Sequence, residues 1–272
     1  MTRRLGTRSR RLCHGERVNS RALRFGSVAS AYERFRPGYP DRLVDDVLAY
    51  ADRPVRTALE IGAGTGKATR AFAARGIAVT ATDPDPAMLA ELRIRVPQAV
   101  VTVEASLEQL SLAQAYDLFF AASALHWTDP VGRWSRIATL ITPGGVFASF
   151  GSQLRLDDPA VSEAVGDVLA AYGLDDNVPS PDGTPADSPV QWPGTELLAA
   201  REFTDLRQRT LERRLSMSAT DYVGHLSTVS AYLVLPEDLR AEVLDRIAAA
   251  LPQRVSVNAD LVLQLARRSG RT

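Results

Sequence analysis

The feature that most constrains this chain is a glycine-rich turn that directly follows an apolar run. Thr57-Ala-Leu-Glu-Ile61 leads into Gly62, Gly64 and Gly66, and a helix-forming stretch comes next. Glycine allows a backbone to turn sharply and to approach a ligand where a side chain would collide. A second apolar run, Val79-Thr-Ala-Thr-Asp83, then ends in an acid. This order predicts a strand, a tight turn, a helix and a second strand around a nucleoside-binding site.

Two common nucleotide-binding turns do not fit the spacing. A dinucleotide-binding turn has the pattern G-x-G-x-x-G, but its last position counted from Gly62 is Lys67. A phosphate-binding P-loop has the pattern G-x-x-x-x-G-K-[ST], but Ile61 stands in place of its first glycine and Ala68 in place of its hydroxyl residue. The P-loop is therefore excluded, and a NAD-type oxidoreductase is disfavoured.

Two acids mark the turn instead. Glu60 lies two residues before the first glycine, where a carboxylate would repel a pyrophosphate but would suit a ligand with an ammonium or sulfonium group. Asp83 ends the second predicted strand, where a carboxylate can accept hydrogen bonds from both ribose hydroxyls. An adenosine attached to an amino acid satisfies both acids.

These residues resemble the class I S-adenosylmethionine (SAM)-dependent methyltransferases, in particular the small-molecule branch of type 11 and trans-aconitate methyltransferase-like proteins. Glu60-Ile-Gly-Ala-Gly-Thr-Gly66 matches the E-x-G-x-G-x-G motif of that branch without a gap. The resemblance extends over roughly residues 25 to 270. It also rests on four further elements, which are Asp83, Asp117, Leu125-His-Trp127 and Leu140-Ile-Thr-Pro-Gly-Gly-Val-Phe147.

The resemblance implies SAM as the cofactor, S-adenosylhomocysteine (SAH) as the product, and a set of contacts to them. Glu60 would organise the turn and the cofactor's amino group, and the backbone of Ala121 would approach the methionyl part. Met88 would pack on the adenine, or else face the core. Ser106 stands where many relatives have an adenine-contacting Asp, so this contact is expected to be weaker. The other expected cofactor residues are Tyr32, Arg36, Gly62, Ala63, Gly64, Gly66, Asp83, Pro84 and Leu107.

The acceptor side depends first on the segment after the fourth predicted strand. His126 is the candidate catalytic residue, either as a general base or as a group that holds the substrate, and the alternative is a loop histidine bonded to backbone. The segment Leu125-His-Trp127 resembles the L-[HQ]-W segment of methyltransferases for small carboxylic acids, with Trp127 as an apolar wall. Tyr39 and His225 are the other expected acceptor residues. Arg36 could bind the carboxylate of either the cofactor or the acceptor.

We therefore expect a SAM-dependent methyltransferase that acts on an oxygen of a small molecule, with a carboxylate favoured over a hydroxyl. Methylation of nitrogen or carbon remains open. A non-catalytic SAM-binding protein also remains open, because a glycine turn reports binding rather than chemistry.

The composition limits the classes of partner that the protein is expected to bind. Lysine and arginine number 32, as do aspartate and glutamate, so the chain lacks the basic excess typical of nucleic-acid binding. The lone Cys13 excludes an internal disulfide framework, and we expect neither a membrane helix nor a signal peptide. The expectation is a cytoplasmic monomer or homodimer that acts on a small molecule, without nucleic acid, membrane or a bound metal.

The chain is expected to form one α/β domain with a doubly wound, seven-stranded, mostly parallel sheet. Five strands near residues 57–61, 77–82, 98–103, 116–121 and 146–150 alternate with helices, which is typical of parallel sheets. Two more strands near 205–213 and 259–267 complete the sheet, and the resemblance implies that the final one is antiparallel. The expected additions are lid helices over residues 25–50 beside a SAM-binding core over 55–150, and a substrate-covering insertion before the last two strands, with cap segments over 151–204 and 214–252.

The first 24 residues form a separate, Arg-rich segment. They carry eight arginines against the single acid Glu16 and show no apolar periodicity, so we expect disorder. A nucleic-acid or membrane-surface arm and an organellar transit peptide are alternatives. We favour an extension without a role, which leaves residues 25–272 as the methyltransferase domain.

Overall fold

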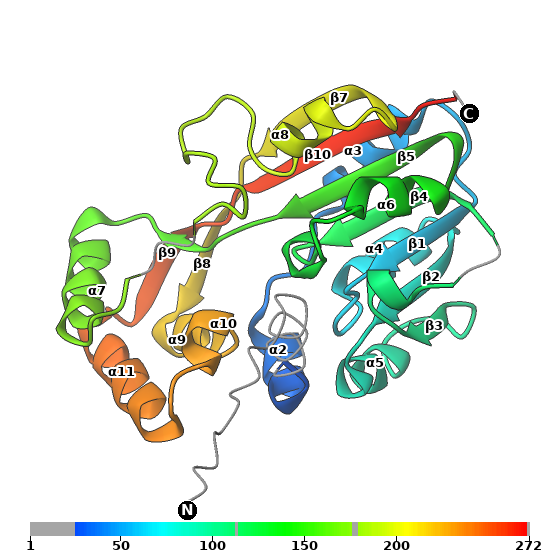
Figure 1. Ribbon diagram of the computed structural model, residues 1–272. Helices are drawn as coiled ribbons and strands as arrows, with labels where there is room; N and C mark the ends of the chain where they lie inside the picture. Colours follow the sequence, from blue (N-terminus) through cyan, green and yellow to red (C-terminus); the bar gives the residue numbers. More distant parts are fainter. Residues whose placement is uncertain (1–24, 112–113, 176–178, 271–272) are drawn as a thin grey trace, which may run out of the picture.

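A seven-stranded sheet forms the main body of the structure (Figure 1). The computed structural model describes residues 25–111, 114–175 and 179–270, so the Arg-rich segment of residues 1–24 lies outside the described part. The strand order is β3-β2-β1-β4-β5-β10-β7, and β10 is antiparallel to both of its neighbours. This confirms the predicted sheet and its antiparallel final strand. The strands are β1 (Thr57–Ile61), β2 (Ala78–Asp83), β3 (Val101–Glu104), β4 (Tyr116–Ala122), β5 (Ile141–Gly151), β7 (Phe203–Leu211) and β10 (Leu261–Arg268).

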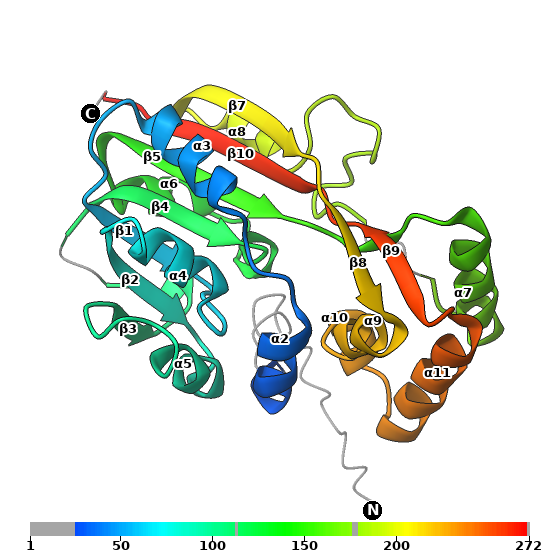
Figure 2. The same ribbon diagram turned by 180° about the vertical axis from the view of Figure 1, so that it is seen from behind.

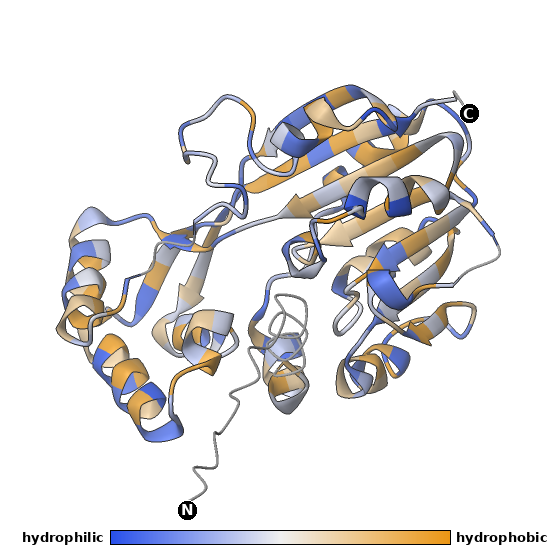
Figure 3. Cartoon of the chain, in the orientation of Figure 1, coloured by the Kyte–Doolittle hydropathy of each residue, from blue (hydrophilic) through white to orange (hydrophobic). Residues whose placement is uncertain are grey.

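Apolar side chains on both faces of the sheet explain why its strands are central. Side chains alternate between the faces of a strand, so in β4 Leu118 and Phe120 point to one face while Phe119 and Ala121 point to the other. All four side chains are completely buried. Figure 3 shows the apolar colouring that runs along β4, β5 and β10. A strand that is apolar on both faces requires a layer of helices on each side.

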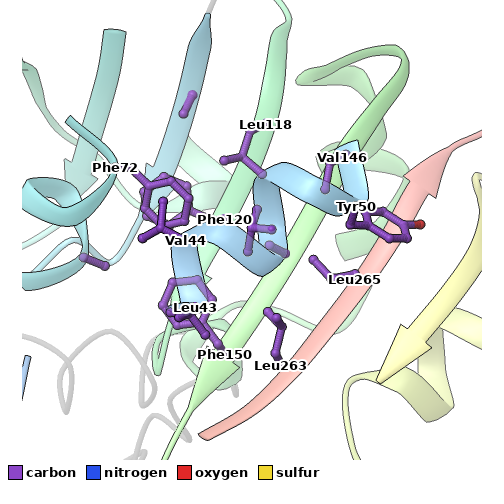
Figure 4. Close-up of a cluster of buried hydrophobic side chains, with 14 of the residues drawn as sticks. Leu43, Val44, Tyr50, Phe72, Leu118, Phe120, Val146, Phe150, Leu263 and Leu265 are labelled. Carbon is purple, nitrogen blue, oxygen red and sulfur yellow. The ribbon is translucent and has the colours of Figure 1, made fainter. Parts of the chain in front are cut away.

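Helices supply those two layers. The first face is covered by α3 and α4, whose Leu43, Val44 and Phe72 pack on β4 and β5 (Figure 4). The second face is covered by α6 and α8, through Ile137 and Leu197. The helices and single turns around the sheet are α3 (Asp41–Ala51), α4 (Lys67–Ala73), α5 (Pro86–Arg93), η2 (Leu107–Gln109), η3 (Leu125–Trp127), α6 (Arg133–Thr139) and α8 (Gly194–Ala199).

A second lobe with its own apolar core stands beside the sheet (Figure 1). It contains a three-stranded antiparallel sheet in the order β6-β9-β8, which the sequence analysis did not predict. In the chain, β6 and α7 precede β7, whereas the elements from β8 to β9 lie between β7 and β10. The lobe is therefore built from two separate segments of the chain, on either side of β7. The elements are β6 (Arg155–Leu156), α7 (Pro159–Ala171), β8 (Arg214–Ser218), α9 (Ala219–Leu226), α10 (Ser230–Leu233), α11 (Glu237–Ala250) and β9 (Arg254–Asn258).

The N-terminal helix lies between the main sheet and the second lobe (Figures 1 and 2). It consists of the turn η1 (Phe25–Val28) and α2 (Ala29–Phe35), and it ends before the Pro37-Gly-Tyr-Pro40 segment. The structure therefore places the expected lid helix next to both halves of the molecule.

Candidate cofactor and acceptor site

One pocket lies where the main sheet, α2 and the second lobe meet. Its wall includes the glycine turn after β1 and the end of β4, which is the edge of a parallel sheet where ligands bind. Seven of the residues predicted for the site line this pocket: Tyr32, Arg36, Tyr39, Glu60, Gly62, Ala63 and His225. The other lining residues are Pro37, Gly38, Thr65, Lys67, Ala68, Ala122, Ser123, Ser152, Leu154, Arg213, Ala259 and Leu261.

The glycine turn needs glycine for both conformation and space. Gly62 and Gly66 have φ values of 59° and 83°, which side chains rarely adopt. A Cβ at Gly62 would also overlap the methyl group of Ala124, and one at Gly66 would approach Leu92 of α5. The turn therefore closes tightly against two neighbouring segments while its remaining edge faces the pocket.

Glu60 is a buried acid in the pocket wall with an unused oxygen. Its residue exposure is 0%, and Thr69 donates a hydrogen bond of 2.5 Å to Oε2. Oε1 is buried and has no hydrogen-bond partner among the described residues. Desolvation raises the pKa of Glu60 to about 8, and the nearby Asp83 contributes in the same direction. A buried carboxyl with a free oxygen suits a ligand that brings an ammonium group.

Asp83 lies at the end of β2 beside the glycine turn. Its two oxygens accept hydrogen bonds from the backbone N–H groups of Gly64 and Asp85, each at 2.9 Å. Desolvation raises its pKa to about 6, and the like charge of Asp85 adds to this. The carboxylate thus shapes the turn directly, and its predicted bond to a ribose would use the remaining lone pairs.

Several other residues predicted to bind the cofactor lie outside the pocket wall. Ser106, before η2, has a buried Oγ without a partner among the described residues. Met88 of α5, Leu107 and Ala121 are 3%, 2% and 0% exposed, so each of these side chains packs inside the protein. Pro84, together with Gly64 and Gly66, also lies outside the wall. Met88 is thus buried, and Ser106 offers a polar atom for the ligand.

Unpartnered buried atoms test whether this site fits SAM. Four side chains in the described part of the chain have a buried polar atom without a hydrogen-bond partner: Glu60, Ser106, His225 and Gln264. Buried polar groups are nearly always paired in folded proteins. Three of these four side chains were predicted from the sequence as site residues, so the unused hydrogen-bonding capacity gathers where a ligand is expected.

Two guanidinium groups line the pocket without an acidic partner within ion-pair distance in the described structure, those of Arg36 and Arg213. Arg36 donates from Nε to Thr228 Oγ1 and from Nη2 to the Thr228 carbonyl, both at 2.9 Å, and its guanidinium lies 5.1 Å from the ring centre of Tyr32. Arg213 donates from Nη1 to the Gly38 carbonyl at 2.7 Å. Desolvation lowers the pKa of Arg213, because its charge is costly there without a counterion. These charges favour an anionic ligand.

His225 reaches the same pocket from α9. The residue is 4% exposed, and its Nδ1 is one of the unpartnered atoms. Desolvation lowers the pKa of His225 to about 3, and the positive charge of Arg36 acts in the same direction. The imidazole is therefore neutral at physiological pH.

His126 and Trp127 occupy the turn η3, which follows β4, and neither residue lines the pocket. Their ring centres lie 4.7 Å apart, and Trp127 makes an edge contact with Phe25 at 5.9 Å. His126 is exposed, so water reaches part of its surface. Desolvation of the ring and the charge of Arg133 nevertheless lower its pKa below 6.5, and the ring is neutral at pH 7. The structure thus places the predicted catalytic histidine beside the pocket, not in its wall.

Sequence reasoning did not single out several residues of the wall. Arg213 follows β7, Leu154 precedes β6, and Ala259 follows β9, so all three lie in connections between the main sheet and the second lobe. No local motif distinguishes them. Thr65 and Lys67 lie within the recognised turn segment, and their position next to the glycines was the available signal.

The described residues contain no group of three or more His, Cys, Asp or Glu side chains that could hold a metal ion. Over the same residues, no helix combines the length and the apolar character needed to cross a bilayer.

The fold and the site together define a class I SAM-dependent methyltransferase. A methyltransferase domain family matches residues 59–149. The uncharacterized methyltransferase Rv3342 of Mycobacterium tuberculosis is 31% identical over 232 residues, which cover 85% of this chain and 86% of that protein. This chain therefore belongs to the methyltransferase family.

Other comparisons cover shorter stretches or the fold alone. Malonyl-[acyl-carrier protein] O-methyltransferase of Haemophilus ducreyi is 33% identical over 150 residues, or 50% of this chain and 58% of that protein. Trans-aconitate 2-methyltransferase of Escherichia coli is 36% identical over 92 residues, or 33% of this chain and 36% of that protein. A solved structure described as a type II methyltransferase from Anaeromyxobacter dehalogenans has a TM-score of 0.59 at 24% identity and covers 87% of this chain and 100% of its own. It supports the fold.

Proposed function

We propose that this methyltransferase transfers the methyl group of SAM to an oxygen of a small acidic molecule, with a carboxylate as the favoured acceptor and a hydroxyl as the second choice. The observation that carries the proposal is the pair of guanidinium groups, Arg36 and Arg213, in the wall of one pocket. SAM has a single carboxylate, so one of these two cations is left for a second anion. The acceptor is the remaining ligand of the site.

The acids of the site complement the charges of SAM. Glu60 would offer its free oxygen to the ammonium group, Asp83 and Ser106 would bind the ribose and the adenine, and the backbone ends of β1 and β4 would contact the methionyl part. SAM supplies an electrophilic methyl group on its sulfonium. The chain contributes position, orientation and exclusion of water, which account for much of the rate of an in-line displacement.

A carboxylate acceptor also fits the position of His126. A carboxylic acid with a pKa near 4 is already ionised at pH 7, whereas a phenol near 10 requires about 4 kcal/mol unless a base removes its proton. Since His126 lies outside the pocket wall, an acceptor that needs no base is the simpler match. The names of two relatives, an O-methyltransferase of a malonyl group and a methyltransferase of trans-aconitate, support an acidic acceptor.

A product-resolved assay tests this proposal. The purified protein would be incubated with methyl-labelled SAM and matched panels of carboxylic acids, phenols and amines. Methyl esters release labelled methanol in mild base, whereas methyl ethers and methylamines do not. Base-labile product from carboxylic acids is the expected result. Transfer to amines or to carbon, or binding of SAM without any transfer, would contradict the proposal.

A further inference from the structure

The acceptor side of the pocket includes a helix from the second lobe. Helix α9 packs so closely on α2 that a Cβ at Gly224 would overlap the ring of Phe35. A glycine inside a helix costs about 1 kcal/mol relative to alanine, and here it permits this close approach. The adjacent residue, His225, is thereby brought into the pocket wall.

The imidazole of His225 has hydrogen-bonding capacity that the described protein does not use. It is neutral, so it has one N–H donor and one nitrogen lone pair. Its Nδ1 is buried without a partner in the described part of the chain. A buried polar atom without a partner is unfavourable, and a ligand oxygen would satisfy it.

His225 and Arg36 are anchored to the same turn. Arg36 donates two hydrogen bonds to Thr228, and the Thr228 hydroxyl donates at 2.7 Å to the carbonyl of His225. Thr228 thus connects the Arg36 guanidinium to the backbone of His225. Both residues line the same pocket, and the charge of Arg36 acts on the imidazole. Arg36 suits a carboxylate, whereas a neutral imidazole suits an uncharged or shared oxygen such as a hydroxyl.

We propose that Arg36 and His225 form one acceptor-binding subsite, in which the guanidinium binds a carboxylate and the imidazole binds a second oxygen of the same molecule. This inference rests on the proposed acidic acceptor and narrows it to acids with a further oxygen function, such as hydroxy acids. His225 then determines specificity and does not serve the cofactor.

Nuclear magnetic resonance can test this subsite without methyl transfer. The chain has three histidines, so single variants at His14 and His126 assign the imidazole resonances of His225. The SAH complex would be titrated with acetate and with glycolate, which have the same charge and differ by one hydroxyl. Both should shift the His225 resonances, with glycolate binding roughly fivefold or more tightly. The absence of a shift, or equal affinities for the two acids, would overturn the proposal.

Two variants at position 225 distinguish the loss of the imidazole hydrogen bond from a change in side-chain shape. His225→Phe should remove the preference for glycolate, and His225→Asn, which keeps an amide near the position of Nδ1, should restore part of it. With an acid that is turned over in the assay above, His225→Phe should raise KM about tenfold or more and leave SAH affinity within about twofold. An equal loss of SAH affinity would assign His225 to the cofactor and refute the inference.

The two proposals fail separately. If carboxylic acids are methylated but His225 is insensitive to acetate and glycolate, only the subsite is wrong. If carboxylic acids are not methylated, the titration still decides whether Arg36 and His225 bind an acid.

Discussion

The hydroxyl of Thr65, in the glycine turn, donates a hydrogen bond of 2.6 Å to the carboxylate of Glu33 on α2. Lys67 and Arg70 form ion pairs with the same carboxylate at 3.4 Å and 2.9 Å. Burial alone would raise the pKa of Glu33, but the Thr65 bond and the two cations hold it below its ordinary value. One side chain thus fastens the lid helix to the cofactor turn.

Loss of the contacts between Glu33 and the glycine-turn segment should speed exchange of the cofactor. Glu33→Gln removes the charge and weakens three contacts, so α2 should open more often. We expect SAH to dissociate about tenfold faster, which corresponds to about 1.4 kcal/mol, within the range for hydrogen bonds to charged groups. Stopped-flow displacement measures the rate. Glu242→Gln, which changes an acid that accepts from Tyr172 in the second lobe, is the control. Equal dissociation rates for wild type and Glu33→Gln would show that Glu33 does not hold α2 against the cofactor turn.

The stability of the ligand-free protein should fall as the pH rises from about 6.5 to 8. At lower pH His225 acts in the opposite direction, because the unfolded chain protonates this imidazole and the folded protein keeps it neutral. The pKa of Glu60 is raised to about 8 and that of Asp83 to about 6, so the folded state retains protons that the unfolded chain has released. Proton retention favours the folded state at the acidic end of this window. Glu60→Gln should flatten the upper part of the curve of Tm against pH. Parallel curves for wild type and Glu60→Gln would show that Glu60 is ionised throughout.

His126 should matter for only one class of acceptor. A phenol needs a base, and if His126 reaches the acceptor in the complex, His126→Gln should lower the rate with a phenol by roughly 10²–10⁴, the usual contribution of a general base. With a carboxylic acid it should have little effect, since no proton has to be removed. Steady-state kinetics with one acceptor of each class measures the difference. Similar losses with both would mean that His126 positions the acceptor or the turn.

Arg133 should be important for the stability of the turn that holds His126. The residue is 4% exposed, and its guanidinium donates to the Thr128 hydroxyl and carbonyl at 2.7 Å and 2.8 Å, and to Glu196 at 3.0 Å. Arg133→Met removes all three hydrogen bonds and leaves Glu196 without its cationic partner, so it should destabilise the protein by about 3–5 kcal/mol. Urea unfolding measures this, with the exposed Arg136→Met as a control that should cost under about 0.5 kcal/mol. A loss as small as that of the control would be inconsistent with the buried network.

The main sheet could be predicted because its signals are local. Strands such as β1 and β4 are mostly apolar runs, and the turn after β1 is specified by glycines at fixed spacing. The small sheet was missed because β6 has two residues and β8 begins three residues after β7 ends. Such short antiparallel strands are determined by pairing in the folded protein more than by their own sequence.

The site was predictable on the cofactor side and less so on the acceptor side. Glu60 and Asp83 belong to consecutive strand ends, so topology brings them together. Arg213 and Leu154 come from connections to the second lobe, and only the packing of that lobe places them in the wall. Asp117, part of the recognised pattern, instead accepts from the N–H groups of Arg56 and Thr57 at the start of β1 and has a structural role.

Calorimetric titration with SAH tests the central claim most directly, because SAH retains the adenosine and amino-acid groups of SAM and lacks only the methyl and its charge. We predict micromolar or tighter binding to the wild-type protein. Asp83→Ala should weaken binding by about 1.5–3 kcal/mol, since it removes charged hydrogen bonds and the support of the turn. No binding of SAH or SAM to the folded protein, or an affinity unchanged in Asp83→Ala, would contradict this assignment of the site.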